Sequence, residues 1–311
     1  SNTPRIITQR HHLLHSTTAM KKTSYILLYS ILTLLLAGLL ILDCCLGSII
    51  ITPSQIWDSL TNTPNDAVMG ILQHFRFPKA ITACIAGAGL AVAGQLMQTL
   101  FANPLAGPYV LGVSSGAGLG VALLLLGSSL LPAVLVGNIW LQILAAILGA
   151  LVVMLLVLMV SARTSDTVSL LLVGMMFGSI AGALINVLQS ISNPEALKMY
   201  VVWSMGSIGA VTWNMLIIMV PVVALGLMGS LLLAKKLNAL LLGENYAVGL
   251  GVSMGWTRTW IILITCILAA TITAFTGPIA FIGMAVPHIA RGIFRTANHR
   301  VILPACMLIG A

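Results

Sequence analysis

Side chains that could carry out acid–base, metal or nucleophilic chemistry are scarce in this sequence and are not grouped. The patterns that cradle ATP phosphates (G-x-x-x-x-G-K-[ST]) or hold a catalytic zinc (H-E-x-x-H) do not occur. The cysteines lack metal-ligand spacing, and we interpret them as small hydrophobic residues; they are Cys44, Cys45, Cys84, Cys266 and Cys306. The sequence therefore predicts neither an enzyme nor a bound cofactor or metal.

Ionisable residues inside long apolar runs are the usual sign of an ion-coupled pump, and they are nearly absent here. Asp43 stands at the end of one run. His288, in VPHIAR, lies near the end of another, beside Arg291 and Arg295, where a helix-end hydrogen bond is commoner than proton transfer. We therefore expect a membrane conduit whose energy comes from a partner protein.

The composition requires a lipid bilayer around the chain. Of 311 residues, 59% are hydrophobic and only 6% are charged, whereas soluble domains average about 25% charged residues. The net charge of +8 does not indicate nucleic-acid binding, because Lys and Arg lie in short clusters between apolar runs and form no basic stripe with aromatic residues. The predicted fold class is all-α, as a polytopic membrane protein.

Eight apolar runs are long enough to cross about 30 Å of hydrocarbon. They cover residues 25–46, 80–101, 109–130, 134–160, 168–190, 213–234, 257–275 and 279–294. A ninth begins near Val301 and is interrupted at Ala311. We therefore expect a transmembrane domain over residues 20–311 that lacks one to two C-terminal helices. Residues 1–19 are polar, and we expect a disordered leader or a foreign remnant there.

Charge bias between the runs predicts the orientation in the membrane. We place the N-terminus, with Lys21 and Lys22, in the cytoplasm. The basic residues that then fall inside are Arg163, Lys235, Lys236, Arg258, Arg291, Arg295 and Arg300. Arg76, Lys79 and Lys198 fall outside, together with Asp43, Asp58, Asp66 and Glu195.

Three segments between the runs are more than short turns. Residues 47–77 are expected to form a long polar outer loop, and residues 193–212 a short helix that enters the outer half of the membrane and returns. Residues 237–253 fit a short helix at the cytoplasmic surface, or alternatively an ordinary linker. Glycines at helical spacing predict close helix packing; they are Gly112, Gly116 and Gly120, and Gly174, Gly178 and Gly182.

Six motifs in one order carry a family resemblance. They are RFPK at 76–79, GLxxAGxxMQ at 89–98, NPLA at 103–106, LGVSSGA at 111–117, GPIAFIGMAVPHIAR at 277–291 and NHRVILP at 298–304. With them, the chain resembles the permease family of ABC importers for vitamin B12, ferric siderophores and haem, the FecCD/BtuC type. The resemblance covers nearly all of residues 20–311.

The resemblance implies a ten-helix permease in a bacterial inner membrane, here truncated within helix nine. It also implies a homodimer, two cytoplasmic ATP-binding subunits and a periplasmic or lipoprotein substrate-binding protein. An iron chelate, haem or cobalamin would be carried inward, and the sequence does not separate these from an oxyanion. Met199 and Met205 are interpreted as packing residues. The alternatives are an ion-gradient-driven secondary transporter and a membrane scaffold without transport.

The resemblance also implies roles for particular residues. Asn103 and Leu105 match the cytoplasmic gate between helices two and three, and a plain turn is the alternative. Thr167 matches the gate between helices four and five, where RTSDTVS offers several hydroxyls. Arg76 and Lys79 match a basic pair that docks the binding protein; the alternative is an anchor for helix two at the membrane interface.

Residues 238–252 match the cytoplasmic segment that seats in a groove of the ATPase, a helix-in-groove contact. The residues to which the resemblance assigns this coupling are Leu240, Leu241, Leu242, Gly243, Ala247, Val248, Gly249 and Leu250.

Overall fold

The structure is a computed structural model that describes residues 22–47, 49–61, 66–127, 137–164 and 166–311. All regular structure in these ranges is helical, which confirms the predicted all-α class. The expectation for residues 1–19 lies outside the described residues.

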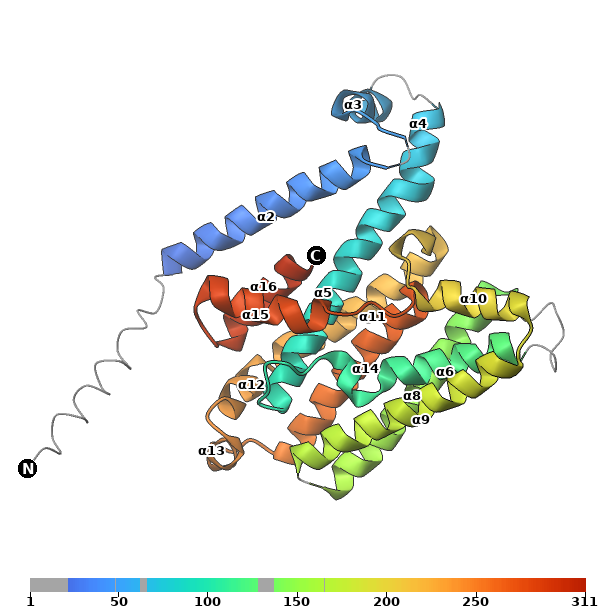
Figure 1. Cartoon of the computed structure of the whole chain (residues 1–311). Coiled ribbons are helices and arrows are strands. Elements are labelled where there is room, and N and C mark those ends of the chain that lie inside the picture. Colours follow the sequence, from blue (N-terminus) through green and yellow to red (C-terminus); the bar gives the residue numbers. More distant parts are fainter. Residues whose placement is uncertain (1–21, 48, 62–65, 128–136, 165) are drawn as a thin grey trace, which may run out of the picture.

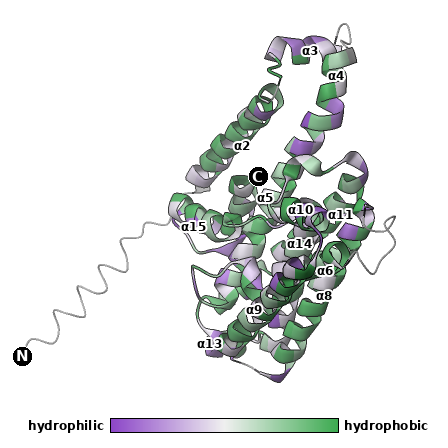
Figure 2. Cartoon of the chain, turned by 45° about the vertical axis from the view of Figure 1, so that its right-hand side comes forward, coloured by the Kyte–Doolittle hydropathy of each residue, from purple (hydrophilic) through white to green (hydrophobic). Residues whose placement is uncertain are grey.

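Six helices in the described ranges are long and apolar enough to cross a membrane. They are α2 (Lys22–Cys45), the continuous helix that ends in α5 (Phe77–Leu100), α8 (Ile139–Arg163), α9 (Thr167–Ile191), α11 (Trp213–Leu232) and α14 (Met254–Thr276). Each corresponds to a predicted run. Apolar residues dominate their surfaces, while hydrophilic residues gather toward the ends, including α3 and α13 (Figure 2).

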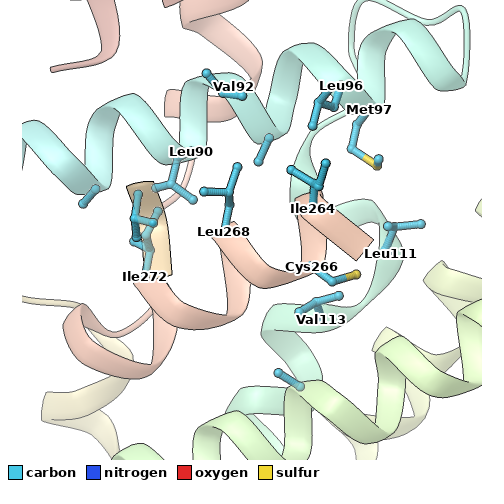
Figure 3. Close-up of a cluster of buried hydrophobic side chains, with 14 of the residues drawn as sticks. Leu90, Val92, Leu96, Met97, Leu111, Val113, Ile264, Cys266, Leu268 and Ile272 are labelled. Atoms are coloured by element: carbon cyan, nitrogen blue, oxygen red, sulfur yellow. The ribbon is translucent and has the colours of Figure 1, made fainter. Parts of the chain in front are cut away.

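Helix α5 passes through the middle of the molecule, with the other helices around it (Figure 1). Its face is buried against α14, α11 and the C-terminal helices. Figure 3 shows this packing with Leu90, Leu96, Met97, Ile264, Leu268 and Ile272. All residues from Ala86 to Gln98 of α5 are buried, so this part of the helix lies at the centre of the described bundle.

The segment before α5 is helical, so the expectation of a long loop over residues 47–77 is wrong. It contains α3 (Pro53–Thr61), α4 (Asp66–Ile71) and a π-helical turn, η1 (Leu72–Arg76), that continues into α5. The signal was present at the start of α3, where Thr52 and Gln55 form a reciprocal capping box: Thr52 N donates to Gln55 Oε1 at 2.9 Å and Gln55 N to Thr52 Oγ1 at 3.3 Å.

Two predicted spans are shorter than expected. Helix α6 (Val113–Leu126) has 14 residues and α15 (Ile282–Phe294) has 13, so each is only about 20 Å long and does not cross about 30 Å of hydrocarbon by itself. The backbone before each helix is irregular: η2 (Pro108–Leu111) precedes α6. The Tyr109 hydroxyl donates to the Ile279 carbonyl, which joins the two irregular stretches.

Short helices lie between the long helices or follow the last of them. Residues 193–212 contain α10 (Pro194–Ser204) and a 3-10 turn, η4 (Ile208–Ala210). Residues 237–253 lie in α12 (Ala234–Leu240), α13 (Glu244–Gly249) and their flanks, and α16 (His299–Gly310) follows α15.

Close backbone contacts at glycines hold the bundle together. A Cβ at Gly94 of α5 would overlap the backbone of Gly283 in α15. A Cβ at Gly116 of α6 would come within 2.6 Å of the Gly149 carbonyl oxygen in α8. These contacts agree with the predicted role of small residues in helix packing within lipid. Gly182 is the exception in the predicted ladders, because no other atom lies within 4 Å of its would-be Cβ.

Candidate functional site

The predicted functional residues separate onto two ends of the bundle. We call them the Asn103 end, where α5 finishes, and the Arg76 end, where α5 begins. The Asn103 end also contains the α8–α9 connection, α12, α13 and the starts of α14 and α16, as the hydrogen bonds described below show. The structure therefore brings both predicted gate pieces and the predicted coupling segment to one end.

The loop after α5 carries the first gate pair. Asn103 Oδ1 accepts a hydrogen bond of 2.9 Å from Leu105 N, so the asparagine shapes its own turn. Asn103 N donates to the Gln98 carbonyl oxygen at 3.1 Å, which attaches the loop to the last turn of α5. The Leu105 side chain is 71% exposed. This geometry places an apolar side chain in the open, on a loop fixed to the central helix.

Thr167, the second gate candidate, is the first residue of α9. The residue before it, Asp166, caps the helix: its carboxylate accepts from Val168 N at 3.1 Å, Ser169 N at 3.0 Å and Ser169 Oγ at 2.6 Å. The hydrogen bond from the Ser169 hydroxyl, followed by those from the two backbone N–H groups, lowers the pKa of Asp166 below its usual range. The sequence hypothesis did not single out this aspartate, although Asp at an N-cap is a recognisable signal.

The coupling segment presents apolar side chains to its surroundings. The more exposed members are Leu241, Leu242, Val248 and Leu250, which are 48%, 62%, 57% and 60% exposed. Tyr246, which the sequence hypothesis omitted, is 61% exposed. Such a cluster on one end of the molecule is typical of an interaction surface.

Four predicted coupling residues add no well-exposed apolar side chain to that surface. Ala247 is fully buried against its own chain, so its side chain does not contribute to the exposed surface. Leu240 is half-buried and packs on the hydrophobic core. Gly243 has φ 99°, which favours glycine and separates α12 from α13. Gly249 is exposed, with no atom within 4 Å of a would-be Cβ.

Arg258 connects the coupling segment to the second gate piece. Its side chain, at the start of α14, is 5% exposed. Nη2 lies 3.3 Å from Glu244 Oε1 in α13, and Nη1 donates to the Thr164 carbonyl oxygen at 3.0 Å in the α8–α9 connection. One guanidinium thus holds α13, α14 and the connection before Thr167 together.

A buried polar network links the coupling segment to α5. His299, the first residue of α16, is fully buried. Its Nδ1 lies 2.9 Å from Asn238 Oδ1 in α12, and its Nε2 lies 2.7 Å from Thr99 Oγ1 in α5. Gln95 Nε2, also of α5, is 3.2 Å from His299 Nε2. The sequence hypothesis included His299 in a motif and Asn238 in the coupling segment but gave neither a role, and it did not single out Thr99 or Gln95. No local pattern shows that these residues meet.

Arg291 of α15 completes the network. Nη1 donates to Gln95 Oε1 at 2.8 Å, and Nη2 donates to Gln98 Oε1. Gln98 Nε2 donates to the Met284 carbonyl oxygen at 3.1 Å. Both glutamines are almost fully buried, and their amides are satisfied on both sides. His288, which the sequence analysis considered for proton transfer, is exposed.

At the opposite end, Arg76 and Lys79 are engaged within their own chain. The Arg76 side chain is buried, with Nη2 donating to the Ile49 carbonyl oxygen at 2.8 Å and Nη1 to that of Asp43 at 3.3 Å. Lys79 Nζ lies 2.6 Å from Asp43 Oδ1, and both side chains are 35% exposed. Lys79 is therefore the member of the pair that a partner protein can reach.

The Arg76 end also contains a cavity of about 580 Å³. Helices α8, α10 and α14 line it with Gln142, Glu195, Lys198, Trp203 and Phe275. A cavity of this volume, lined by both polar and apolar side chains, is typical of a small-molecule binding site. Among the residues that the structure describes, no group of three or more His, Cys, Asp or Glu side chains could hold a metal ion.

Comparison with known proteins places these features in a family. Residues 33–311 match the FecCD transport family. The chain is 34% identical over 286 residues to the hemin transport system permease protein HmuU of Yersinia pestis, covering 92% of this chain and 84% of the relative. It is 36% identical over 281 residues to the vitamin B12 import system permease protein BtuC of Klebsiella pneumoniae, covering 90% and 80%.

The fold agrees with this match. A solved inward-facing structure of an ABC transporter assigned to the metal-chelate type has a TM-score of 0.79 and 30% sequence identity to this chain, covering 90% of it and 85% of the solved chain. With several helices able to cross a membrane and relatives that are bacterial permeases, this is a multi-pass membrane protein. The family resemblance seen in the motifs is confirmed: the chain belongs to the FecCD transport family, as a permease of the ABC transporter class.

Proposed function

We propose that this chain is the membrane subunit of an ABC importer that carries an iron chelate, haem or cobalamin into the cytoplasm. ATP would be hydrolysed by a partner subunit, and the permease itself would catalyse no reaction. The observation that carries this proposal is the placement of an exposed apolar surface, α12–α13, at the same end as both predicted gate pieces. A motor protein bound there would act close to the gate.

The Asn103 end is proposed to face the cytoplasm. Most of the basic residues outside the apolar cores of the helices lie at this end, as expected for cytoplasmic loops. Asn103 and Leu105, with Thr167 opposite them in a homodimer, would narrow the inner mouth of the path. Leu105 is the residue best placed to close a pore by an apolar constriction, because it is open to its surroundings.

The coupling role rests on the exposed side chains of α12 and α13. Leu241, Leu242, Tyr246, Val248 and Leu250 offer an apolar surface that a helix-in-groove contact would bury. Glycines with positive φ at 243 and 251 bound α13. Two such segments, one from each copy in a homodimer, would each seat on one ATP-binding subunit.

At the Arg76 end we propose docking of a periplasmic or lipoprotein binding protein and delivery of the substrate to the cavity beside α10. Lys79 would steer the encounter, and exposed charge of this kind contributes more to association rate and register than to affinity. The named substrates of the two relatives, hemin and vitamin B12, support a large chelate as cargo.

The experiment is co-purification and stimulated hydrolysis. The permease is expressed with its candidate ATPase and binding protein, and ATP turnover is measured as ferric siderophore, haem or cobalamin loads the binding protein. Stimulation by one ligand supports the proposal and identifies the cargo. A stable permease that forms no complex and responds to none of these ligands would contradict it. Turnover that follows a sodium or proton gradient instead would favour a secondary transporter.

Gly249→Trp tests the coupling surface in the same assay. Because nothing lies within 4 Å of a would-be Cβ at Gly249, the indole is accommodated in the free permease but blocks a close contact with a partner. Stimulation should be lost while membrane insertion is retained. Gly38→Trp in α2, also with open space around it, is the matched control and should keep stimulation.

A further inference from the structure

We propose that Asn238, His299 and Thr99 form the mechanical link that transmits movement of the coupling segment to the gate loop. The inference rests on the proposed function, because it assigns the transmission step between the ATPase contact and the gate. Three side chains from three helices, α12, α16 and α5, are joined by hydrogen bonds in sequence.

The first connection joins α12 to α16. Asn238 Oδ1 accepts from the His299 backbone N at 2.7 Å and lies 2.9 Å from His299 Nδ1. Since an amide oxygen offers only lone pairs, we assign the ring proton to Nδ1. Asn238 Nδ2 donates to Asn298 Oδ1 at 2.8 Å, and Asn298 Oδ1 also accepts from Arg300 N and so caps α16. The asparagine side chain is therefore bound to the start of α16 at three points.

The second connection joins α16 to the last turns of α5. With its proton on Nδ1, the neutral ring presents a lone pair at Nε2, which lies 2.7 Å from Thr99 Oγ1 and 3.2 Å from Gln95 Nε2. Gln95 Nε2 can donate one of its two protons to the ring and the other to Thr99 Oγ1 at 3.2 Å. The single proton of the Thr99 hydroxyl can go either to His299 Nε2 or to the Gln95 carbonyl oxygen at 2.9 Å. Arg291 holds Gln95 Oε1 at 2.8 Å and thereby turns the amide nitrogen toward the histidine. The orientation of each group is thus consistent with that of its neighbours.

The third connection joins these turns to the gate loop. Ala102 N donates to the Thr99 carbonyl oxygen at 3.3 Å, and Asn103 N donates to the Gln98 carbonyl oxygen at 3.1 Å. The Gln98 side chain is itself fixed by Arg291 and by the Met284 carbonyl. The loop that carries Asn103 and Leu105 is therefore attached directly to the residues that the network positions.

Burial explains why this network can transmit movement. His299 is fully enclosed, and Gln95 and Gln98 are 3% and 5% exposed, so water cannot readily replace a broken hydrogen bond. A displacement of α12 that left α16 and α5 behind would leave several buried donors and acceptors unsatisfied, which is costly at low dielectric. Movement of the three helix ends together costs less free energy than movement of α12 alone. The network provides the contiguous physical contact that a coupling claim requires.

The test separates transmission from folding. The purified importer, with its ATPase and binding protein, is prepared with Asn238→Ala, Thr99→Val or Thr99→Ser, each in combination with Leu105→Cys. Thiol labelling at position 105 is read by mass spectrometry with and without ATP, and transported ligand per ATP hydrolysed is measured in vesicles. Valine matches the shape of threonine without its hydroxyl, whereas serine keeps the hydroxyl.

The wild-type network should give ATP-dependent labelling at position 105. In Asn238→Ala and Thr99→Val that dependence should be lost, and ligand per ATP should fall roughly 2- to 30-fold, the range for loss of one member of a coupled network. Thr99→Ser should restore both. Asn214→Ala is the matched control, since this exposed asparagine of α11 makes no side-chain hydrogen bond to the described residues.

Two results would overturn the inference while leaving the proposed function intact. One is unchanged labelling and transport in both Asn238→Ala and Thr99→Val. The other is equal loss in Thr99→Val and Thr99→Ser, which would show that the hydroxyl is not the link. An unsubstituted chain with no ATP-dependent labelling and no ligand-stimulated hydrolysis would overturn the proposed function, and the inference with it.

Discussion

Arg76 Nη2 donates a hydrogen bond of 2.8 Å to the carbonyl oxygen of Ile49, and this pair closes the segment between α2 and α5. The guanidinium also reaches the Asp43 carbonyl, and a Cβ at Gly47 would overlap it. An arginine so enclosed shapes its own chain. Beside it, Lys79 pairs with Asp43 and stays partly exposed, so the two basic residues of one motif have different surroundings.

Arg76 is predicted to matter for stability more than Lys79 does. Arg76→Ala removes two hydrogen bonds donated by a buried, charged side chain, for a loss of about 1.5–3 kcal/mol. Lys79→Ala removes one partly exposed ion pair, for a loss below about 1 kcal/mol. Thermal unfolding in detergent compares the two variants. Equal losses would mean that the Arg76 contacts do not hold the segment.

We predict that Lys79, and not Arg76, contributes to docking of the binding protein. Lys79→Gln should slow capture of the binding protein, most clearly at low salt, because screening weakens the steering charge as ionic strength rises. Lys79→Arg retains the charge and is the matched control. Association rates over a salt series measure the effect. A salt slope that does not change in Lys79→Gln would show that the residue only anchors α5.

Exposed and buried members of the coupling segment should respond differently to substitution. Leu242→Ser and Val248→Ser remove apolar contact area from the proposed ATPase surface, so ligand-stimulated hydrolysis should fall while the melting temperature of the free permease is unchanged. Ala247→Leu forces a larger side chain into a filled site and should destabilise the permease by about 1–3 kcal/mol. Loss of stability in the serine variants would place those leucine and valine side chains in the core instead.

Gly94 and Gly182 differ in how closely another helix approaches them, so together they test whether close packing at glycine stabilises the bundle. Gly94→Ala should destabilise the bundle by about 1–3 kcal/mol, because its Cβ meets the backbone of Gly283, which cannot move away like a flexible side chain. Gly182→Ala, in open space within α9, should be neutral or slightly stabilising. Unfolding in detergent measures both. A neutral Gly94→Ala would show that α5 and α15 are not packed through this contact.

Asp166 gives a pH dependence to the start of α9. Hydrogen bonds from Ser169 and Val168 lower the pKa of Asp166 in the folded chain, while an unfolded Asp titrates near about 3.9. The cap therefore contributes stability that is fully present above the unfolded pKa and is lost as pH falls through the folded value. Asp166→Asn, which keeps an acceptor but does not titrate, should remove this part of the acid sensitivity.

The measurement is the difference in melting temperature between wild type and Asp166→Asn from pH 6 down to pH 3. That difference should narrow or reverse as the wild-type carboxylate becomes protonated. A constant difference over the whole range would show that the carboxylate charge does not contribute to the cap.

The sequence alone determined the class, the family and most of the long helices. Apolar runs as long as residues 134–160 or 168–190 have few stable alternatives in lipid, because every backbone N–H and C=O must be bonded within the segment. The motifs around Asn103 and Gly277 indicated the family by their order. Charge bias predicted which loops share an end, and the structure agrees. Which end faces the cytoplasm stays a prediction.

Tertiary structure decided the rest, since local patterns do not report which distant residues meet. Hydropathy placed full spans at 109–130 and 279–294, yet α6 and α15 are shorter, and irregular backbone that the Tyr109 hydroxyl joins through the Ile279 carbonyl precedes them. The polar composition of residues 47–77 concealed the helices α3 and α4. Thr99 and His299 lie 200 positions apart in the chain, and only the packing of α16 on α5 brings the hydroxyl to the imidazole, because burial makes each the other's available partner.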